Sequence, residues 1–321
     1  MVTSRSLFQT QTMAEKKCGT DRCLNNEYSQ CIDLNDRHQV NEIINRLTKD
    51  VIEPTERELV QRRVLNAISN IKIALVVIDF QNDFISGSLS VKKGSAGEDP
   101  VDAIPAINSL VMEKELDAVV YTQDWHPANH ISFVERARDP DRKIRDDKQN
   151  VPLKAFDTVQ FDKPPVTQTL YPAHCVENSW GAELHAGLVL SRTGTLIVKK
   201  GQHTYVDSYS AFRDNNRKQL NGLDKLLKSR QITVFLGCGL AYDICVRHTV
   251  RDANDYGYLT GVVRDCSKGF SQKMVEDTNR VFASENIAIL DAQAARDIIN
   301  KKKVPLEWLV KLVGPNIRIK T

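Results

Sequence analysis

QITVFLGCGLAYDICVRHTVRDANDY, residues 231–256, is the stretch that decides the fold. It opens with a β-branched apolar run, Ile232 to Leu236, and passes through two glycines. Side chains then recur at four-residue spacing, at Ile244, His248 and Asp252. This order predicts a buried strand, a tight turn and a helix.

Cys245 falls in the first turn or so of that predicted helix. Unpaired N–H groups and the positive end of the helix dipole there favour a thiolate over a thiol. A strand-to-helix turn is therefore a good position for a nucleophile. An inert buried thiol is the alternative, because free cysteine is among the most buried residue types. The stretch alone does not decide between them.

The same alternation of strand and helix patterns runs through residues 71–300. The expected strands are 71–78, 118–121, 194–200, 232–236, 260–263 and 287–290, and the expected helices are 102–114, 217–229, 240–256, 274–283 and 292–299. Near-continuous β-branched runs indicate strands that are covered on both faces. We therefore predict an α/β fold with a doubly wound, mainly parallel six-stranded sheet and helices on both faces.

Four segments lie outside this pattern. Residues 1–35 are expected to form a disordered or loosely ordered tail, and 36–70 a helical extension that packs on the main domain or serves as an oligomer contact or regulatory arm. Residues 134–170 are charged, rich in proline and without periodicity, so we expect a long insertion over the site. The C-terminal tail, 301–321, is apolar enough to dock, with a partner subunit as one candidate.

Composition excludes several classes of protein. The chain has 321 residues, 41% hydrophobic and 26% charged, and a net charge of only +3, with no basic run interleaved with aromatics that would bind nucleic acid. No apolar stretch approaches the ~20 residues that span a bilayer. Seven irregularly spaced cysteines indicate a reducing compartment. We expect a cytoplasmic protein, with the nucleus also open and an organelle transit peptide at the N-terminus less favoured.

Asp79 and Lys200 join Cys245 at the carboxyl ends of predicted strands. Ligands bind outside that edge of an open α/β sheet. A carboxylate there could take part in chemistry or be satisfied by loop amides. A lysine there could hold a carboxylate or stabilise an oxyanion.

Asp124, His126 and His130 lie within seven residues at the end of another predicted strand, and His174 lies in a later loop. One hard oxygen and imidazole nitrogens suit a first-row divalent metal. Taken alone, a capping aspartate and surface histidines explain the pattern equally well. Their position on the same rim as the other three candidates favours a metal site.

Five motifs together resemble the nicotinamidase/pyrazinamidase branch of the isochorismatase-like hydrolases. They are VVIDFQNDF (76–84), TQDWHPANHISF (122–133), YPAHCV (171–176), KKG…YSAF (199–212) and GLAYDICVRHTVRDA (239–253). They occur in the family's order, and the resemblance covers about 75–290. Residues 1–70 and most of the insertion lie outside it.

The resemblance implies a role for each matching residue. Asp79 matches the catalytic acid, Lys200 the family's lysine and Cys245 the nucleophile. The implied metal ligands are Asp124, His126 and His174, with His130 matching a histidine that approaches the metal in some members. Leu240–Ala241 falls where the family has a cis peptide, so the N–H groups of Ala241 and Cys245 are the expected oxyanion hole. The expected substrate contacts are Phe84, Trp125, Tyr171 and Tyr242.

The implied activity is metal-dependent hydrolysis of nicotinamide to nicotinate and ammonia through a cysteine thioester, in NAD salvage. Zn2+ is the expected metal, with Fe2+ or Mn2+ as alternatives. Nicotinamide is the expected partner, without nucleic acid or membrane, and we expect a homo-oligomer. A hydrolase of another small amide and a catalytically silent nicotinamide-binding protein remain the alternatives. His248 is expected to be structural, although its spacing from Cys245 would also suit a Cys–His dyad.

Overall fold

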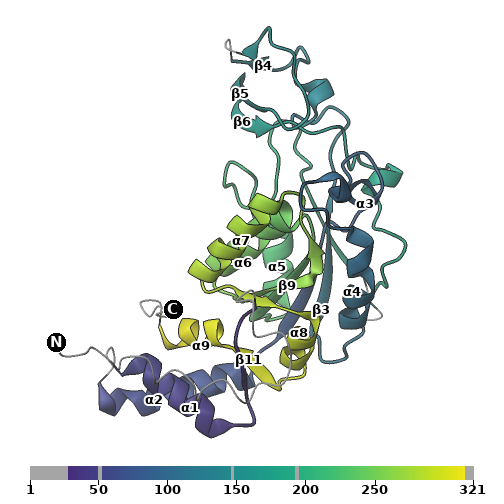
Figure 1. Ribbon diagram of the computed structural model, residues 1–321. Helices are drawn as coiled ribbons and strands as arrows, with labels where there is room; N and C mark the ends of the chain where they lie inside the picture. The colour runs from purple at the N-terminus through teal and green to yellow at the C-terminus, as the bar shows by residue number, and fades with distance from the viewer. Residues whose placement is uncertain (1–27, 50–52, 146–147, 192–194, 315–321) are drawn as a thin grey trace, which may run out of the picture.

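The computed structural model describes residues 28–49, 53–145, 148–191 and 195–314 (Figure 1). Its centre is a parallel sheet of six strands in the order β10-β9-β8-β2-β3-β7. The strands are β2 (Ile73–Ile78), β3 (Ala118–Asp124), β7 (Leu196–Lys200), β8 (Val234–Leu240), β9 (Leu259–Lys268) and β10 (Ala288–Leu290). The predicted doubly wound fold is confirmed.

Helices cover both faces of this sheet. They are α3 (Asn82–Ile85), α4 (Ile104–Val111), α5 (Asn221–Ser229), α6 (Arg247–Asp255), α7 (Gln272–Ser284) and α8 (Ala292–Ile299). Alternate residues of β2 serve different cores: Leu75 and Val77 pack in the cluster that includes α4 and α8, while Val76 packs in the cluster that includes α5, α6 and α7. Burial on both faces explains why β2 is apolar throughout.

Short helical turns complete the connections. They are η1 (Val91–Lys93), η2 (Pro100–Ala103), η3 (Val134–Arg136) and η5 (Trp180–Ala182), together with a π-helical turn, η6 (Tyr242–Val246). The turn η6 leads directly into α6, so the helix predicted after Gly239 begins with a wider turn. π-helical turns of this kind often mark functional sites.

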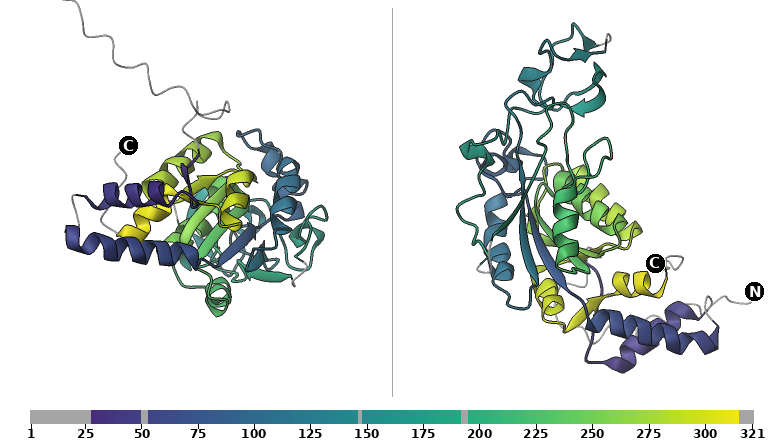
Figure 2. Two further views of the ribbon diagram at one scale, coloured as in Figure 1. Left: turned by 90° about the horizontal axis from the view of Figure 1, so that it is seen from below. Right: turned by 180° about the vertical axis from the view of Figure 1, so that it is seen from behind.

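The first and last described segments meet at the amino ends of the central strands. β1 (Cys31–Asp33) pairs antiparallel with β11 (Lys303–Pro305). The helices α1 (Arg37–Thr48), α2 (Pro54–Ser69) and α9 (Leu306–Val313) form a layer across this end (Figures 1 and 2). Trp308 of α9 is fully buried, and its Nε1 donates to the Thr260 carbonyl at 2.8 Å.

The structure bears on two expectations about the segments near the chain ends. The expected tail 1–35 includes an ordered strand, β1, although residues 1–27 lie outside the described residues. The C-terminal segment does dock, but α9 docks on its own chain against α1 and α2. The N-terminal hairpin buries its apolar stripe in the same place, because Val40, Ile44 and Val64 belong to the main core.

The insertion 134–170 is more ordered than its composition predicted. It contains an antiparallel sheet of β4 (Lys143–Ile144), β5 (Thr158–Lys163) and β6 (Pro165–Thr169). This sheet has a small core of its own, and Val159 and Phe161 point into it while their neighbours are exposed. The prediction of no periodicity was wrong for β5. The sheet projects beyond the end of the molecule opposite the N-terminal helices (Figures 1 and 2).

Candidate active site

Asp79, Lys200 and Cys245 meet at the carboxyl edge of the central sheet. Asp79 directly follows β2, Lys200 ends β7, and Cys245 lies in η6 after β8. The Lys200 Nζ atom lies 2.9 Å from Asp79 Oδ2 and 3.5 Å from Cys245 Sγ. The three side chains come from separate strand ends, and the parallel sheet brings them into contact.

Lys200 is the centre of this cluster. Its Nζ also lies 2.5 Å from Asp124 Oδ1 and donates to the Ser208 carbonyl at 2.9 Å. Burial opposes its charge, but the carboxylates of Asp124 and Asp79 outweigh burial and raise the pKa of Lys200 well above its usual range. Lys200 is therefore a permanent buried cation that links the catalytic candidates to the metal candidates.

The protonation states of Asp79 and Cys245 follow from their burial. Burial raises the pKa of Asp79, although Lys200 and the Thr122 hydroxyl, which donates to Oδ1 at 2.6 Å, favour its ionised form. Burial also raises the pKa of the Cys245 thiol well above its usual range, against the opposing effect of Lys200. The helix position had predicted a thiolate. Burial therefore favours the thiol over the thiolate, so Cys245 needs a base to lose its proton, and Asp79 is adjacent.

Asp124, His126 and His174 form a buried group suited to a metal ion. One donor atom from each lies within 4.8 Å of the others. His126 Nδ1 bonds the Gly201 carbonyl at 2.8 Å, and His174 Nδ1 bonds the Pro172 carbonyl at 2.9 Å. A carbonyl only accepts, so Nδ1 carries the hydrogen and Nε2 keeps its lone pair for a cation.

Further observations fit a cation at this place. Burial lowers the pKa of His174 to about 4, which keeps its imidazole neutral. Burial favours protonated Asp124, but Lys200 and His126 outweigh it and hold its pKa below the usual range, so its carboxylate stays charged. The Nε2 atom of His126 has no hydrogen-bond partner among the described residues. Burial opposes a charge on His126, but the Asp124 carboxylate outweighs burial and raises the pKa of His126, so this ring favours a positive charge beside it. One carboxylate and imidazole nitrogens suit a first-row divalent ion.

His130 lies against the same group. Its ring stacks on that of His126 with centroids 4.1 Å apart, and its Nδ1 contacts the Ser132 hydroxyl at 2.7 Å. His126, His130 and Asp207 form a second buried set of donor atoms within 4.8 Å. The sequence analysis did not single out Asp207, because nothing in its local spacing marks it as close to the histidines.

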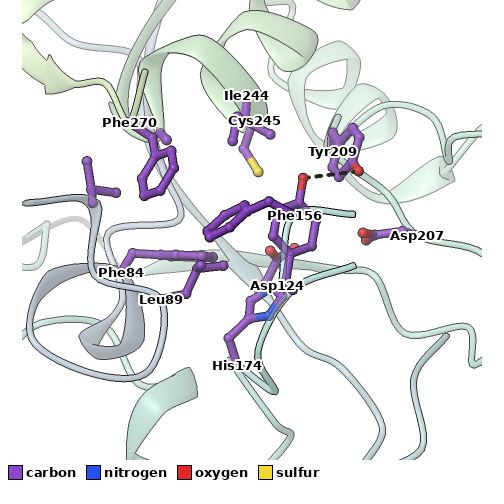
Figure 3. A pocket seen from close by; sticks show the side chains of 13 residues that line it. Phe84, Leu89, Asp124, Phe156, His174, Asp207, Tyr209, Ile244, Cys245 and Phe270 are labelled. Carbon is purple, nitrogen blue, oxygen red and sulfur yellow. Dashed lines mark hydrogen bonds between the residues drawn. The ribbon is translucent and has the colours of Figure 1, made fainter. Parts of the chain in front are cut away.

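A cavity of about 480 Å³, part of it open to solvent, lies over these groups (Figure 3). Its walls are Phe84, Leu89, Val91, Asp124, Phe156, Tyr171, His174, Asp207, Tyr209, Ala241, Ile244, Cys245 and Phe270. The thiol of Cys245 points into it (Figure 3). The cavity is mostly apolar, with acid, thiol and imidazole groups at its base, which is how small-molecule sites are usually built.

Two of the four expected substrate contacts line this cavity and two do not. Phe84 and Tyr171 form part of its walls. Trp125 lies outside them, with Lys199 Nζ 3.2 Å from the centre of its ring. Tyr242 is fully buried in the core, where its hydroxyl donates to Asn279 Oδ1 at 2.6 Å. Tyr242 packs edge to face on Phe282 and is not among the residues that line the cavity, so its expected role in substrate binding has no support in this geometry.

Several cavity walls were not predicted. They include Tyr209, Phe156 and Phe270. Both phenylalanines lie in segments without periodicity, and 114 positions separate them in the chain. His248 packs its ring 5.4 Å from that of Tyr209, and burial lowers its pKa to about 4. The peptide between Leu240 and Ala241 is cis, as the resemblance implied.

Comparisons with known proteins agree with this fold. Residues 73–294 match the family described as the isochorismatase domain. A nicotinamidase of Acinetobacter baylyi is 37% identical over 226 residues, which cover 67% of this chain and 94% of that protein. The structure of PnC1 from L. infantum in complex with nicotinate aligns with a TM-score of 0.55 at 30% identity, over 70% of this chain and 94% of that one.

A third relative carries a metal. The structure of pyrazinamidase of Pyrococcus horikoshii in complex with zinc aligns with a TM-score of 0.51 at 28% identity, over 68% of this chain and 99% of that one. The fold, the polar groups on its rim and these relatives define the class as a hydrolase. The chain belongs to the isochorismatase domain family.

Within the described residues, no helix has both the length and the apolarity needed to cross a membrane.

Proposed function

We propose that this protein hydrolyses nicotinamide to nicotinate and ammonia, as a step in NAD salvage. The observation that carries the proposal is the contact of one buried lysine, Lys200, with both Asp79 and Cys245 at the base of an aromatic-lined cavity. The A. baylyi relative is a nicotinamidase, and the L. infantum relative binds nicotinate. These relatives support a pyridine carboxamide as the substrate.

The proposed reaction begins with a proton transfer. Asp79 takes the thiol proton of Cys245, while Lys200 stabilises the resulting pair of charges. The thiolate sulfur attacks the carboxamide carbon, and the carbonyl oxygen becomes an oxyanion. The backbone N–H groups of Ala241 and Cys245 are the proposed donors to this oxyanion, and one such donor is worth ~3 kcal/mol in other hydrolases.

The second half of the reaction restores the enzyme. Protonated Asp79 gives its proton to the departing nitrogen, the C–N bond breaks, and ammonia leaves behind a thioester on Cys245. A water molecule then attacks the thioester carbon through its oxygen, while Asp79 takes one of the water protons. The C–S bond breaks, nicotinate leaves, and the proton returns to the sulfur.

Asp124, His126 and His174 are the proposed ligands of a divalent cation, with His130 as a further candidate. Zn2+ is the first choice because the P. horikoshii relative is in complex with zinc, and Fe2+ and Mn2+ suit the same donors. When bound, such an ion supplies a Lewis acid that can orient a ring nitrogen. Lys200 contacts both Asp124 and Asp79, so it fixes the position of the proposed metal ligand relative to the proposed base.

The test is release of ammonia from nicotinamide by the purified, metal-replete protein. We expect turnover by the wild type, and loss of it in Cys245→Ala and after treatment with a chelator, with recovery when Zn2+ is restored. An inactive metal-replete wild type would contradict the proposal. A panel of other small aromatic and carbamoyl amides would then identify the substrate.

Cytoplasmic location and self-association remain predictions.

A further inference from the structure

Phe156 belongs to the insertion 134–170, yet its side chain reaches the cavity above Cys245. Its ring stacks against Phe270, with centroids 5.2 Å apart and planes at 27°. It also meets Tyr171 edge to face, with centroids 5.9 Å apart. The two phenylalanine side chains lie close together at the cavity (Figure 3). Phe156 is 48% exposed although it lines the cavity.

The backbone of Phe156 is held in an unusual conformation. Its φ is +73°, in the left-handed region that L-residues rarely adopt. Its N–H donates to the Leu170 carbonyl at 2.6 Å, and the Leu170 N–H donates to the Asp157 carbonyl at 2.8 Å. Strained backbone persists only where its surroundings hold it. The backbone hydrogen bonds at the open end of the β5–β6 hairpin therefore fix the position of this ring over the cavity.

Phe270 is fixed from the other side. Its N–H donates to Asp243 Oδ1 at 2.9 Å, and the Ser271 N–H donates to Asp243 Oδ2 at 2.8 Å. Asp243 lies in η6, two positions before Cys245. One carboxylate therefore ties Phe270 to the turn that carries the nucleophile. Phe156 packs on this anchored residue, so the two rings form one wall of the cavity.

We propose that Phe156 determines substrate specificity by limiting the cavity to a single flat ring. A monocyclic aromatic carboxamide fits beneath the stacked rings of Phe156 and Phe270. A fused-ring amide would have to separate the rings of Phe156 and Phe270 and break the contact between them, so it binds poorly. The inference rests on the proposed amide hydrolysis for its substrate class, but access to the Cys245 thiol can be measured without it.

The first experiment measures access to Cys245 by alkylation. Iodoacetamide is the small reagent and N-(1-pyrenyl)maleimide the fused-ring reagent, and peptide mass spectrometry follows Cys245 separately from the other cysteines. Phe156→Gly removes the ring while glycine suits the positive φ. Phe156→Leu restores apolar bulk. Val151→Ala, at an exposed apolar residue of the same insertion, is the matched control.

We expect Phe156→Gly to raise the rate with the pyrenyl reagent, relative to iodoacetamide, by roughly 10-fold or more, the scale of steric discrimination in apolar pockets. Phe156→Leu should reverse most of this change, and Val151→Ala should leave the ratio of rates unaltered. An unchanged ratio in Phe156→Gly would overturn the proposal, and so would an equal change in Val151→Ala.

The second experiment compares kcat/KM for nicotinamide and for quinoline-3-carboxamide in the same variants. The ratio should shift toward the bicyclic amide in Phe156→Gly alone, and a constant ratio would again count against the proposal. A wild type inactive on nicotinamide would overturn the proposed function only. The alkylation rates would still decide the role of Phe156.

Discussion

Thr122→Val should shift the acid side of the pH–activity profile to higher pH. Thr122 and Asp79 are both fully buried, and the Thr122 hydroxyl donates to Asp79 Oδ1 at 2.6 Å. Valine keeps the branched shape but removes this donor. The Asp79 N–H donates to the Thr122 hydroxyl oxygen at 3.1 Å and to the Thr122 carbonyl at 3.2 Å, and valine keeps only the carbonyl as its acceptor.

The size of the shift follows from the energy of the lost bond. A hydrogen bond to a charged group contributes ~1.5–3 kcal/mol, and one pKa unit corresponds to ~1.4 kcal/mol. The bond favours the ionised carboxylate, so its loss raises the pKa of Asp79 by roughly 1–2 units. Asp79 must be ionised to take the thiol proton. The midpoint of the acid limb of the pH–activity profile should therefore lie higher than in the wild type by about that amount.

The assay is kcat/KM for ammonia release across the acid limb in the wild type, Thr122→Val and Thr122→Ser. Serine keeps the hydroxyl and should retain the wild-type limb. The measured value belongs to the coupled cluster of Asp79, Lys200 and Cys245, so the difference between variants is the quantity to compare. Coincident acid limbs in all three proteins would show that the group controlling activity is not Asp79, and would refute the reasoning.

The remaining predictions concern stability and metal binding. Lys200→Met leaves buried carboxylates without their cation and should lower the free energy of unfolding by ~3–5 kcal/mol in denaturant melts. The double variant Lys200→Met/Asp79→Asn should lose less stability than the sum of the two single losses, and strict additivity would argue against coupling. Trp308→Ala should cost ~3–5 kcal/mol in the same assay, whereas Leu59→Ala, at a residue 62% exposed, should change it by less than ~0.5 kcal/mol. His174→Ala should purify with less bound metal than the wild type by elemental analysis, and equal metal content would exclude His174 as a ligand.

The central fold could be predicted from the sequence because strands buried on both faces must be apolar along their whole length. β2 and β8 are such runs, and the helical periods between strands are equally local signals. A parallel sheet puts its carboxyl ends on one rim, so Asp79, Lys200 and Cys245 could be grouped before any coordinates were known. The small sheet β4-β5-β6 was missed because its strands are short and interrupted by charged residues and prolines.

The tertiary structure decided what depends on many neighbours at once. Whether Cys245 holds its proton is set by burial against the charges of Lys200 and Asp79, and the position of a residue in a helix does not reveal that balance. Phe156 and Phe270 become one wall only through contacts between segments far apart in the chain. α9 covers its own domain because β1 and β11 pair and bring the chain ends together. Local sequence patterns record which side of an element is buried, whereas distances between loops and the net effect of charges arise only when the whole chain is folded.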